Sequence, residues 1–326
     1  MSSDMQEGQD GQQLQPKRRA SFTEPLMKLS SYLLALRPWS FSASLMPVLL
    51  GCALAYKVSG ELNLVGVFLT AVTAIAVHAA GNVVNTLYDF VKGVDVSRSD
   101  DRVLVDHLLT KDELNTLGVL LYLVGCLGFS LLTVVSAARM EHLAFVFFGG
   151  LSSSFLYTGG PGLKYLGLGD ILILVIFGPI SVLFSFLAQT GYVQWPAMLY
   201  AVPLALNTEA ILHSNNTRDL QADKAAGIVT LAITIGYTAS RLLYALLLFT
   251  PYVLCIVHGV NYSSWLLLPC VTMPTAFKIE REFRTVSMQD TPKNTAKLNA
   301  YLGLCLVLAV LMSDANTLPY LTPQRA

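Results

Sequence analysis

The sequence contains few charged residues. Only 13% of its 326 residues are Asp, Glu, Lys or Arg, whereas 54% are hydrophobic, and soluble proteins average about 25% charged residues. Apolar stretches long enough to cross the ~30 Å hydrocarbon core of a bilayer, at ~20 residues each, recur along most of the chain. The composition therefore excludes an ordinary soluble protein and predicts one integral membrane domain.

The sequence also lacks a cysteine framework and an excess of charge of either sign. Its five cysteines lie in apolar segments without a C-x-x-C pair or a metal-ligand spacing, so we interpret them as packing residues. The formal net charge is zero, so the total charge indicates no particular partner, and we expect no nucleic-acid binding. Only the placement of the charges along the chain is informative.

The N-terminal residues have too few apolar side chains to form a core. Residues 1–25 are mostly polar, and we expect a disordered tail. No short hydrophobic core with a small-residue cleavage site follows a basic start, so we expect no removable secretory signal. Residues 26–36 carry apolar side chains at helical spacing, which fits either a short helix in the membrane interface or an extension of the first span.

Hydropathy and polar breaks predict an all-α polytopic membrane bundle with about nine transmembrane helices, within a domain covering residues 26–315 and followed by a short tail, 316–326. The expected spans are residues 39–56, 65–87, 114–135, 142–157, 168–188, 195–212, 240–257, 264–280 and 296–312. In this topology Lys57, Arg139 and Arg325 are the only Lys or Arg residues opposite the N-terminus. The positive-inside rule therefore places the N-terminus in the cytosol.

Two loops rich in acidic residues lie on the cytosolic side of this topology. The first begins in the stretch NVVNTLYDFVKGVD, residues 82–95, and the second reads HSNNTRDLQADKAAG, residues 213–227. Four expected spans separate them, which suggests two similar four-helix halves. We expect the two loops to cap a central cavity.

The first acidic loop continues a polar stripe on a membrane helix. At 100° per residue, His78, Asn82, Asn85 and Asp89 fall within about 60° of one another. An amide or carboxylate inside a bilayer is costly unless it faces the bundle interior with a partner or ligand. We therefore interpret Asn85 and Asp89 as functional. For Asp100, Asp101 and Asp112 we prefer the simpler interpretation of solvated or capping acids.

The second loop repeats the arrangement of oxygen ligands. Asn215, Asp219 and Asp223 recur every four residues and share a helix face. Carboxylate and amide oxygens without Cys suit a hard cation such as Mg2+, which is usually completed by substrate phosphates. We therefore expect Mg2+ to bridge these acidic groups to a diphosphate. The candidate catalytic and metal-binding residues are Asn85, Asp89, Asp95, Asp219 and Asp223.

Further groups near the same mouth are suited to binding the diphosphate. The candidates are Arg102, Tyr157, Lys164, Asn215, Asn216 and Arg218. A loop Lys or Arg more often serves as a positive-inside anchor, but Arg218 lies directly between candidate oxygen ligands. Glycines within residues 152–170 permit close approach of the backbone to a ligand.

The full pattern resembles the UbiA superfamily of intramembrane prenyltransferases. The motifs are N-x-x-x-D-x-x-x-x-x-D, at residues 85–95, and NNTRD-x-x-x-D followed by GIVTLA, at residues 215–232. The segments LRPWSFSASLMPVLLG, 36–51, and YTGGPGLKYLGLGD, 157–170, are similar to the branch that prenylates naphthoquinones. One departure is Thr86, where many bacterial relatives have an Asp. The resemblance covers roughly residues 30–315.

The resemblance implies Mg2+-dependent transfer of an allylic isoprenoid, geranylgeranyl, from its diphosphate to a menadiol-like naphthoquinone. The product would be menaquinone-4, and a step in ubiquinone synthesis is a further implied activity. It implies one Mg2+ on the first acidic loop and one on the second. It also implies a membrane location in the endoplasmic reticulum and Golgi, or in mitochondria, and a regulatory contact with HMG-CoA reductase.

Two other classes of function remain open at the level of sequence. A transporter is one, because intramembrane polar residues often mark transport paths, although the ionisable groups gather at one mouth instead of near the midplane. A lipid- or sterol-sensing regulatory protein without catalysis is the other. Glu209 and His213 lie one helical turn apart, and we prefer a hydrogen-bonded supporting pair to a catalytic or quinone-binding role. We interpret His78 as a satisfied interior histidine.

Overall fold

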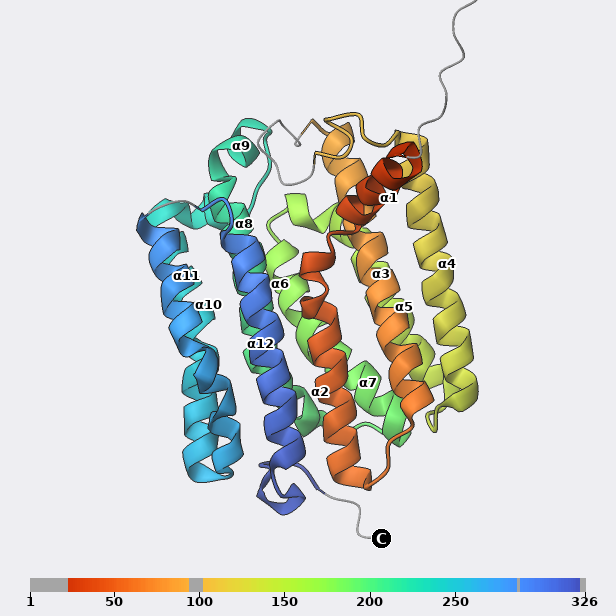
Figure 1. Cartoon of the computed structure of the whole chain (residues 1–326), viewed down its shortest axis with the longest axis vertical. Helices are drawn as coiled ribbons and strands as arrows, with labels where there is room; N and C mark the ends of the chain where they lie inside the picture. Colours follow the sequence, from red (N-terminus) through yellow and green to blue (C-terminus); the bar gives the residue numbers. More distant parts are fainter. Residues whose placement is uncertain (1–22, 94–101, 286–287, 323–326) are drawn as a thin grey trace, which may run out of the picture.

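The computed structural model of the chain describes residues 23–93, 102–285 and 288–322. These residues form one bundle of long helices that run side by side (Figure 1). The only β contact among them is a single bridge between Leu166 and Val229. The all-α prediction is confirmed for this part of the chain.

The helical elements follow one another along the chain with short connections. In order they are α1 (Thr23–Leu36), η1 (Pro38–Ser40), α2 (Ser42–Ser59), α3 (Leu64–Val91), α4 (Lys111–Val135), α5 (Met140–Thr158), η2 (Leu163–Tyr165), α6 (Gly169–Val175), η3 (Ile176–Ile180), α7 (Ser181–Thr190), η4 (Trp195–Ala201), α8 (Val202–Arg218), α9 (Leu220–Ala225), α10 (Leu231–Asn261), η5 (Ser264–Thr272), α11 (Met273–Thr285), α12 (Thr291–Met312) and η6 (Ala315–Thr317).

Six helices of the described residues are long and apolar enough to cross a membrane: α2, α3, α4, the continuous segment Gly169–Thr190, α10 and α12. The segment Gly169–Thr190 joins α6 to α7 through the π-helical turn η3, which contains Pro179; proline and π-turns are common causes of helix bends. The other three expected spans also fall on helices, namely α5, η4 with α8, and η5 with α11. The expected count of about nine spans stays a prediction.

The outer surface of the bundle is apolar. Leu127 and Val134 on α4 are 61% and 81% exposed, and Phe145 on α5 is 83% exposed. Such a surface is costly in water but not in the hydrocarbon of a bilayer, where the helices satisfy their own backbone hydrogen bonds. The bundle therefore has the surface of an integral membrane protein.

Small residues let the helices approach closely. A Cβ on Gly51 of α2 would lie 2.0 Å from Ser185 Oγ, and one on Gly128 of α4 would lie 2.4 Å from Thr73 Oγ1 of α3. Close packing of this kind drives helix association where lipid removes the hydrophobic effect between helices. These contacts fix α2 against α7 and α3 against α4.

The N-terminal helix α1 is a separate element. It lies at a slant across one end of the bundle (Figure 1), and Arg37, with φ 52°, breaks the chain before η1 and α2. Met27 is 60% exposed, while Lys28 forms an ion pair with Glu113 at the start of α4. These features favour the interfacial helix over an extension of the first span.

One end of the bundle collects the polar loops. The C-terminal end of α3, the N-terminal end of α6, the helix α9 and the helix α1 lie at this end, and the segment after α12 lies at the opposite end (Figure 1). The described parts of both acidic loops, residues 82–93 and 213–227, therefore lie at this end (Figure 1). We refer to this end as the acidic end.

Candidate active site

The first half of the site is the polar stripe of α3. Asn85 and Asp89, one turn apart, are only 8% and 4% exposed. Asn85 Nδ2 donates a hydrogen bond of 2.9 Å to Asp89 Oδ2. Because a buried carboxylate requires partners, the neighbouring elements must supply the rest.

The loop between α5 and α6 supplies these partners. Lys164 Nζ donates to Asp89 Oδ2 at 2.6 Å and to Asn85 Oδ1 at 3.1 Å, and Tyr165 Oη donates to Asp89 Oδ1 at 2.7 Å. Thr158 Oγ1, at the end of α5, donates to Asn85 Oδ1 at 3.1 Å. The structure thus brings Lys164 to the first acidic loop, as the sequence suggested. Tyr165 and Thr158 were not predicted.

Glycine allows this loop to fold back on itself. Gly162 has φ +62°, and a Cβ at this position would lie 2.6 Å from the ring of Tyr165. A side chain would therefore meet both backbone strain and a collision. The glycine-rich sequence positions Lys164 and Tyr165 over Asp89.

The second half of the site lies at the junction of α8 and α9. Arg218 Nη2 donates to Asn215 Oδ1 at 2.7 Å and to Asp219 Oδ2 at 2.6 Å, and Arg218 Nε donates to Asp219 Oδ1 at 2.8 Å. A two-pronged guanidinium–carboxylate contact of this kind is strong and directional. Arg218 thus holds the oxygen groups of this loop together, and its expected binding of the diphosphate stays a prediction.

Asp223 on α9 links the two halves electrostatically. It is half-buried, and burial raises the pKa of its carboxyl group from 3.8 to about 6. The nearby cations Lys164 and Arg218 oppose this rise in pKa, whereas the negative charges of Asp219 and Asp89 add to it. The two acidic sets therefore lie within electrostatic reach of one another and of the same cations.

Other predicted residues have different surroundings. Arg102 pairs with Asp106 at 2.8 Å, and its side chain is 48% exposed. Asp112 is exposed in the first turn of α4, which fits a solvated acid. Asp95, a candidate ligand, lies outside the described residues, as do Asp100 and Asp101.

A cavity of about 240 Å³ leads inward from the acidic end. Asn85, Lys164 and Asn215 line its polar mouth, and Phe147 and Phe184 line its apolar interior. Its other lining residues include Tyr157 and Asn216. The cavity thus joins charged groups to an apolar chamber between α2, α3, α5, α6, α7 and α8.

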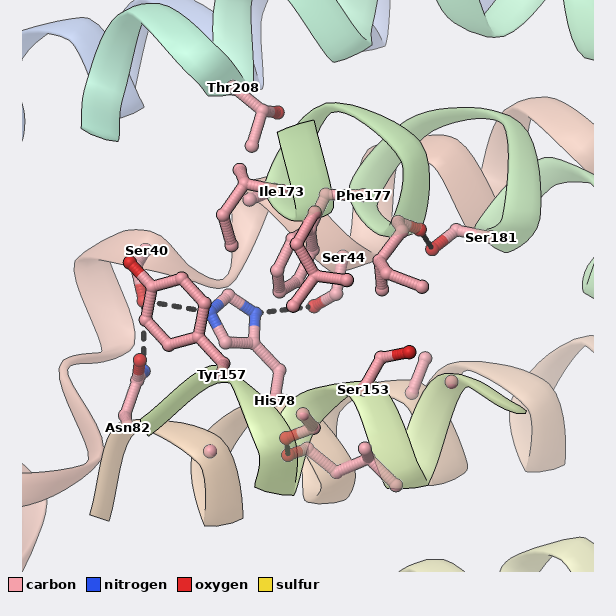
Figure 2. Close-up of a pocket in the computed structure, with 18 of the residues that line it drawn as sticks. Ser40, Ser44, His78, Asn82, Ser153, Tyr157, Ile173, Phe177, Ser181 and Thr208 are labelled. Carbon is pink, nitrogen blue, oxygen red and sulfur yellow. Dashed lines mark hydrogen bonds between the residues drawn. The ribbon is translucent and has the colours of Figure 1, made fainter. Parts of the chain in front are cut away.

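His78 of α3 lies in the wall of this cavity (Figure 2). Its Nε2 is 3.3 Å from Ser40 Oγ and its Nδ1 is 3.0 Å from Ser44 Oγ. Asn82 Nδ2 also donates to Ser40 Oγ, at 3.1 Å. The expectation of a satisfied interior histidine is confirmed, and the same group presents a polar patch in an otherwise apolar wall.

Glu209 and His213 do not form the hydrogen-bonded pair that we expected. His213 Nε2 lies 3.0 Å from the carbonyl oxygen of Ser240, and His213 Nδ1 lies 3.8 Å from Asp170 Oδ1. The carboxylate oxygens of Glu209 have no hydrogen-bond partner in the described chain. The expectation failed because Asp170, which is distant in sequence, enters the same space.

Comparison with known proteins identifies the family. Residues 44–311 match the UbiA prenyltransferase family. The chain belongs to this family. It is 62% identical over 286 residues to the UbiA prenyltransferase domain-containing protein 1 homolog of Drosophila melanogaster, a match covering 87% of this chain and 80% of that protein. It is 52% identical over 295 residues to UbiA prenyltransferase domain-containing protein 1 of Homo sapiens, covering 90% and 86% respectively.

Solved structures share the fold of this UbiA chain. A UbiA homolog from Archaeoglobus fulgidus bound to GPP and Mg2+ aligns with a TM-score of 0.62 at 15% identity, covering 86% of this chain and 99% of that one. The apo structure of a UbiA homolog from Aeropyrum pernix K1 aligns with a TM-score of 0.66 at 14% identity, covering 82% and 97%. The chain is an aromatic prenyltransferase of the UbiA type and an integral membrane protein.

Proposed function

We propose that this prenyltransferase transfers a geranylgeranyl group from its diphosphate to a reduced naphthoquinone, which yields menaquinone-4. The observation that carries this proposal is the cavity. Its mouth bears Asn85, Lys164 and Asn215, and its interior is walled by Phe147 and Phe184. An isoprenoid diphosphate has a charged end and an apolar tail in the same order. A prenylation step in ubiquinone synthesis is a further proposed activity.

The oxygen groups of the mouth fit Mg2+. Lys164 already places a positive charge on Asp89 Oδ2 and Asn85 Oδ1, so this pair of oxygens accepts a cation. Asn85 and Asp89 would hold one ion, with Asp95 added by the sequence motif, and Asp219 and Asp223 would hold the other. When bound, Mg2+ neutralises the charge that develops on the departing diphosphate. In support, a structural neighbour was solved with GPP and Mg2+.

The basic groups of the mouth would bind the diphosphate oxygens directly. Arg218 presents a planar fork suited to two oxygens at once, and Lys164 presents a point charge. Both now contact carboxylates, so the diphosphate and its ions would replace the carboxylates as partners. Tyr157, Asn216 and Arg102 are the further candidates for this binding.

The interior of the cavity would protect the reactive group. Ionisation of the allylic diphosphate leaves a carbocation that water would quench, and an apolar cavity excludes water. Aromatic faces such as that of Phe177, which lines this cavity, stabilise positive charge. The polar patch of His78, Ser40 and Ser44 would lie beside the ring of the acceptor in this cavity.

The placement of the Lys and Arg residues supports a proposed orientation in the membrane, and the resemblance to the family supports a proposed organelle. We propose a single membrane domain at residues 26–315 that spans the bilayer about nine times, with the N-terminus and the acidic end in the cytosol. The endoplasmic reticulum and Golgi are the proposed location, with the mitochondrial membrane as the alternative. A regulatory contact with HMG-CoA reductase belongs to this proposal through the resemblance alone.

The decisive experiment is a reconstituted assay. Purified protein in detergent receives geranylgeranyl diphosphate, menadione under reducing conditions, and Mg2+, and the prenylated quinone is measured by mass spectrometry. We expect product with the unaltered chain, and loss of at least about a hundredfold with Asp89→Ala or Asp219→Ala, because each removes a proposed ligand of the Mg2+ that stabilises the leaving group. Asp112→Ala, which removes an exposed acid of α4, is the matched control and should retain activity.

The assay also separates this function from the two alternatives. A transporter or a sterol-sensing regulator would form no prenylated product, and the Asp89 and Asp219 variants would then behave like the control. EDTA should abolish product formation, since the proposed diphosphate site depends on a divalent ion. Full activity in EDTA would contradict the proposed role of the acidic loops.

A further inference from the structure

A second cluster of ionisable side chains lies where α6 meets α8. Asp170 is in the first turn of α6, and Glu209 and His213 lie one turn apart on α8. One potential ligand atom from each residue lies within 4.8 Å of the others. The three residues are 7%, 5% and 0% exposed, respectively. The cluster is therefore closed to solvent and distinct from the oxygen groups at the cavity mouth.

The polar atoms of this cluster lack partners. With both carboxylates ionised, the two carboxylate oxygens of Glu209, Oδ1 of Asp170 and Nδ1 of His213 have no hydrogen-bond donor or acceptor of suitable geometry among the described residues. Burying a polar atom without a partner costs free energy, and burying two carboxylates side by side costs more. A cation bound between the three groups would neutralise both carboxylates and supply these atoms with a partner; protons shared among the groups are the alternative that the test separates.

The hydrogen bond of His213 determines which of its ring atoms faces the cluster. Nε2 lies 3.0 Å from the carbonyl oxygen of Ser240 on α10, and a carbonyl can only accept, so Nε2 carries a proton. In a neutral ring Nδ1 then presents its lone pair toward Asp170. Histidines that bind metals commonly donate their other ring N–H to a backbone carbonyl in this way.

The separation of the groups also points to a shared ion. His213 Nδ1 and Asp170 Oδ1 are 3.8 Å apart, which is longer than a hydrogen bond of about 2.7–3.2 Å. Two ligands of one tetrahedral ion, with bonds of about 2.0–2.1 Å, lie about 3.4 Å apart. A small inward movement of the side chains would complete such a site.

We propose that Asp170, Glu209 and His213 bind one divalent transition-metal ion, of which Zn2+ fits best. One imidazole and two carboxylates form a three-ligand set suited to Zn2+, whereas Mg2+ prefers oxygen ligands alone. The ion neutralises both carboxylates and occupies the space that the lone pair of Nδ1 faces. This site goes beyond the proposed prenyl transfer and does not depend on it.

The ion would connect the two halves of the active site. Gly169, next to Asp170, packs so closely that a Cβ would lie 3.2 Å from the ring of Tyr157 and 3.4 Å from the Cα of Lys164. His213 precedes Asn215 by two residues on α8. An ion at this point therefore ties the loop that carries Lys164 to the helix that carries the second acidic loop.

The test is metal content. Full-length protein is purified in detergent with an affinity tag that binds no metal and in excess Mg2+, and its transition metals are quantified by mass spectrometry. We expect about one zinc per chain in the unaltered protein and a loss of at least about tenfold in zinc content for Glu209→Gln and His213→Asn. Glu280→Gln, at a buried glutamate that pairs with Arg284 on α11, is the matched control.

A further variant separates this site from the proposed Mg2+ site. Asp89→Asn alters the first acidic loop but should keep its zinc. The proposal is overturned if the unaltered protein neither contains zinc nor takes it up after incubation, or if Glu209→Gln retains it. If the three groups instead share protons through hydrogen bonds, the unaltered protein will contain no zinc and will take up none. If the variants do not fold, X-ray absorption at the zinc edge of the unaltered protein decides: one imidazole with oxygen ligands supports the site, and sulfur ligands overturn it.

Discussion

Asp223 is the acidic residue of the site whose charge changes near neutral pH. Its carboxyl group has a pKa of about 6 in the fold against an ordinary 3.8, so folding favours the protonated form. The unfavourable burial of its charge is absent below about pH 4, grows as the pH rises, and is complete above about pH 6. Without a divalent ion, Asp223 therefore destabilises the fold above this range.

We predict that Asp223→Asn raises the thermal unfolding temperature of the metal-free protein at pH 8. The amide carries no charge, so the difference from the unaltered chain should shrink as the pH falls from 6 to 4. Added Mg2+ should stabilise the unaltered chain above pH 6 but not the variant, which has lost a ligand. Differential scanning fluorimetry in detergent measures both effects. Equal unfolding temperatures at pH 8 would count against the raised pKa.

Individual residues also show how far the sequence alone could lead. The periodicity of α3 predicted that Asn85 and Asp89 share a face, because helix geometry fixes neighbours three and four residues apart. No such rule relates Tyr165 to Asp89 or Asp170 to His213. Their meeting depends on the path of a glycine-rich loop and on the packing of α6 against α8, which the sequence pattern does not encode locally.

The loop between α5 and α6 offers a comparison of two glycines. Gly160 and Gly162 both have positive φ, but a Cβ on Gly162 would lie 2.6 Å from the ring of Tyr165, whereas one on Gly160 would have no contact closer than 3.5 Å. Alanine costs each position backbone strain of about 1–2 kcal/mol. Only at Gly162 does it also displace the aromatic ring that holds Asp89.

We predict that Gly162→Ala lowers kcat/KM for the isoprenoid diphosphate by about tenfold more than Gly160→Ala does, since about 1.4 kcal/mol corresponds to a factor of ten. Steady-state kinetics at saturating acceptor measures the ratio. Similar losses in the two variants would mean that strain alone, and not the position of Tyr165, limits activity.

The close contact of the π-helical turn η3 with α8 allows a prediction about the stability of the fold. A Cβ on Gly178 would lie 2.4 Å from Ala205 Cβ, whereas one on Gly149 of α5 has nothing within 4 Å. We predict that Gly178→Val destabilises the fold by about 1–3 kcal/mol through overpacking, while Gly149→Val has little effect. Unfolding temperatures in the same detergent test this. An unchanged Gly178→Val protein would show that α8 can move away freely.

The two ends of the bundle carry different segments of the chain. α1 and the acidic end lie together, and the residues after α12 lie at the opposite end (Figure 1). The long apolar helices could be predicted, because helix length and hydropathy are local properties of the chain, whereas the nine-span alternation of loops stays a prediction. The number of crossings is harder to predict, since α5, α8 and α11 are shorter or more polar and depend on their neighbours.

We predict opposite exposure of epitope tags at the two termini. In sealed microsomes with the cytosolic face outward, added protease should remove an N-terminal tag and spare a C-terminal tag, because an odd number of crossings separates them. Immunoblotting detects each tag, and detergent should expose both. Removal of both tags from sealed vesicles would contradict the nine-span topology.

The close contact of α3 with α4 also fixes the position of Asp89 relative to α4. Thr73 and Val77 of α3 face Gly128 and Gly125 of α4, where a Cβ would lie only 2.4 Å and 3.0 Å away from them. This interlocking prevents the two helices from sliding past each other. Asp89 lies about 24 Å from Thr73 along α3, at 1.5 Å per residue, so its distance from that contact is constant. In a thicker or thinner bilayer the two helices must tilt as one unit, and Asp89 keeps its distance from the contact between them.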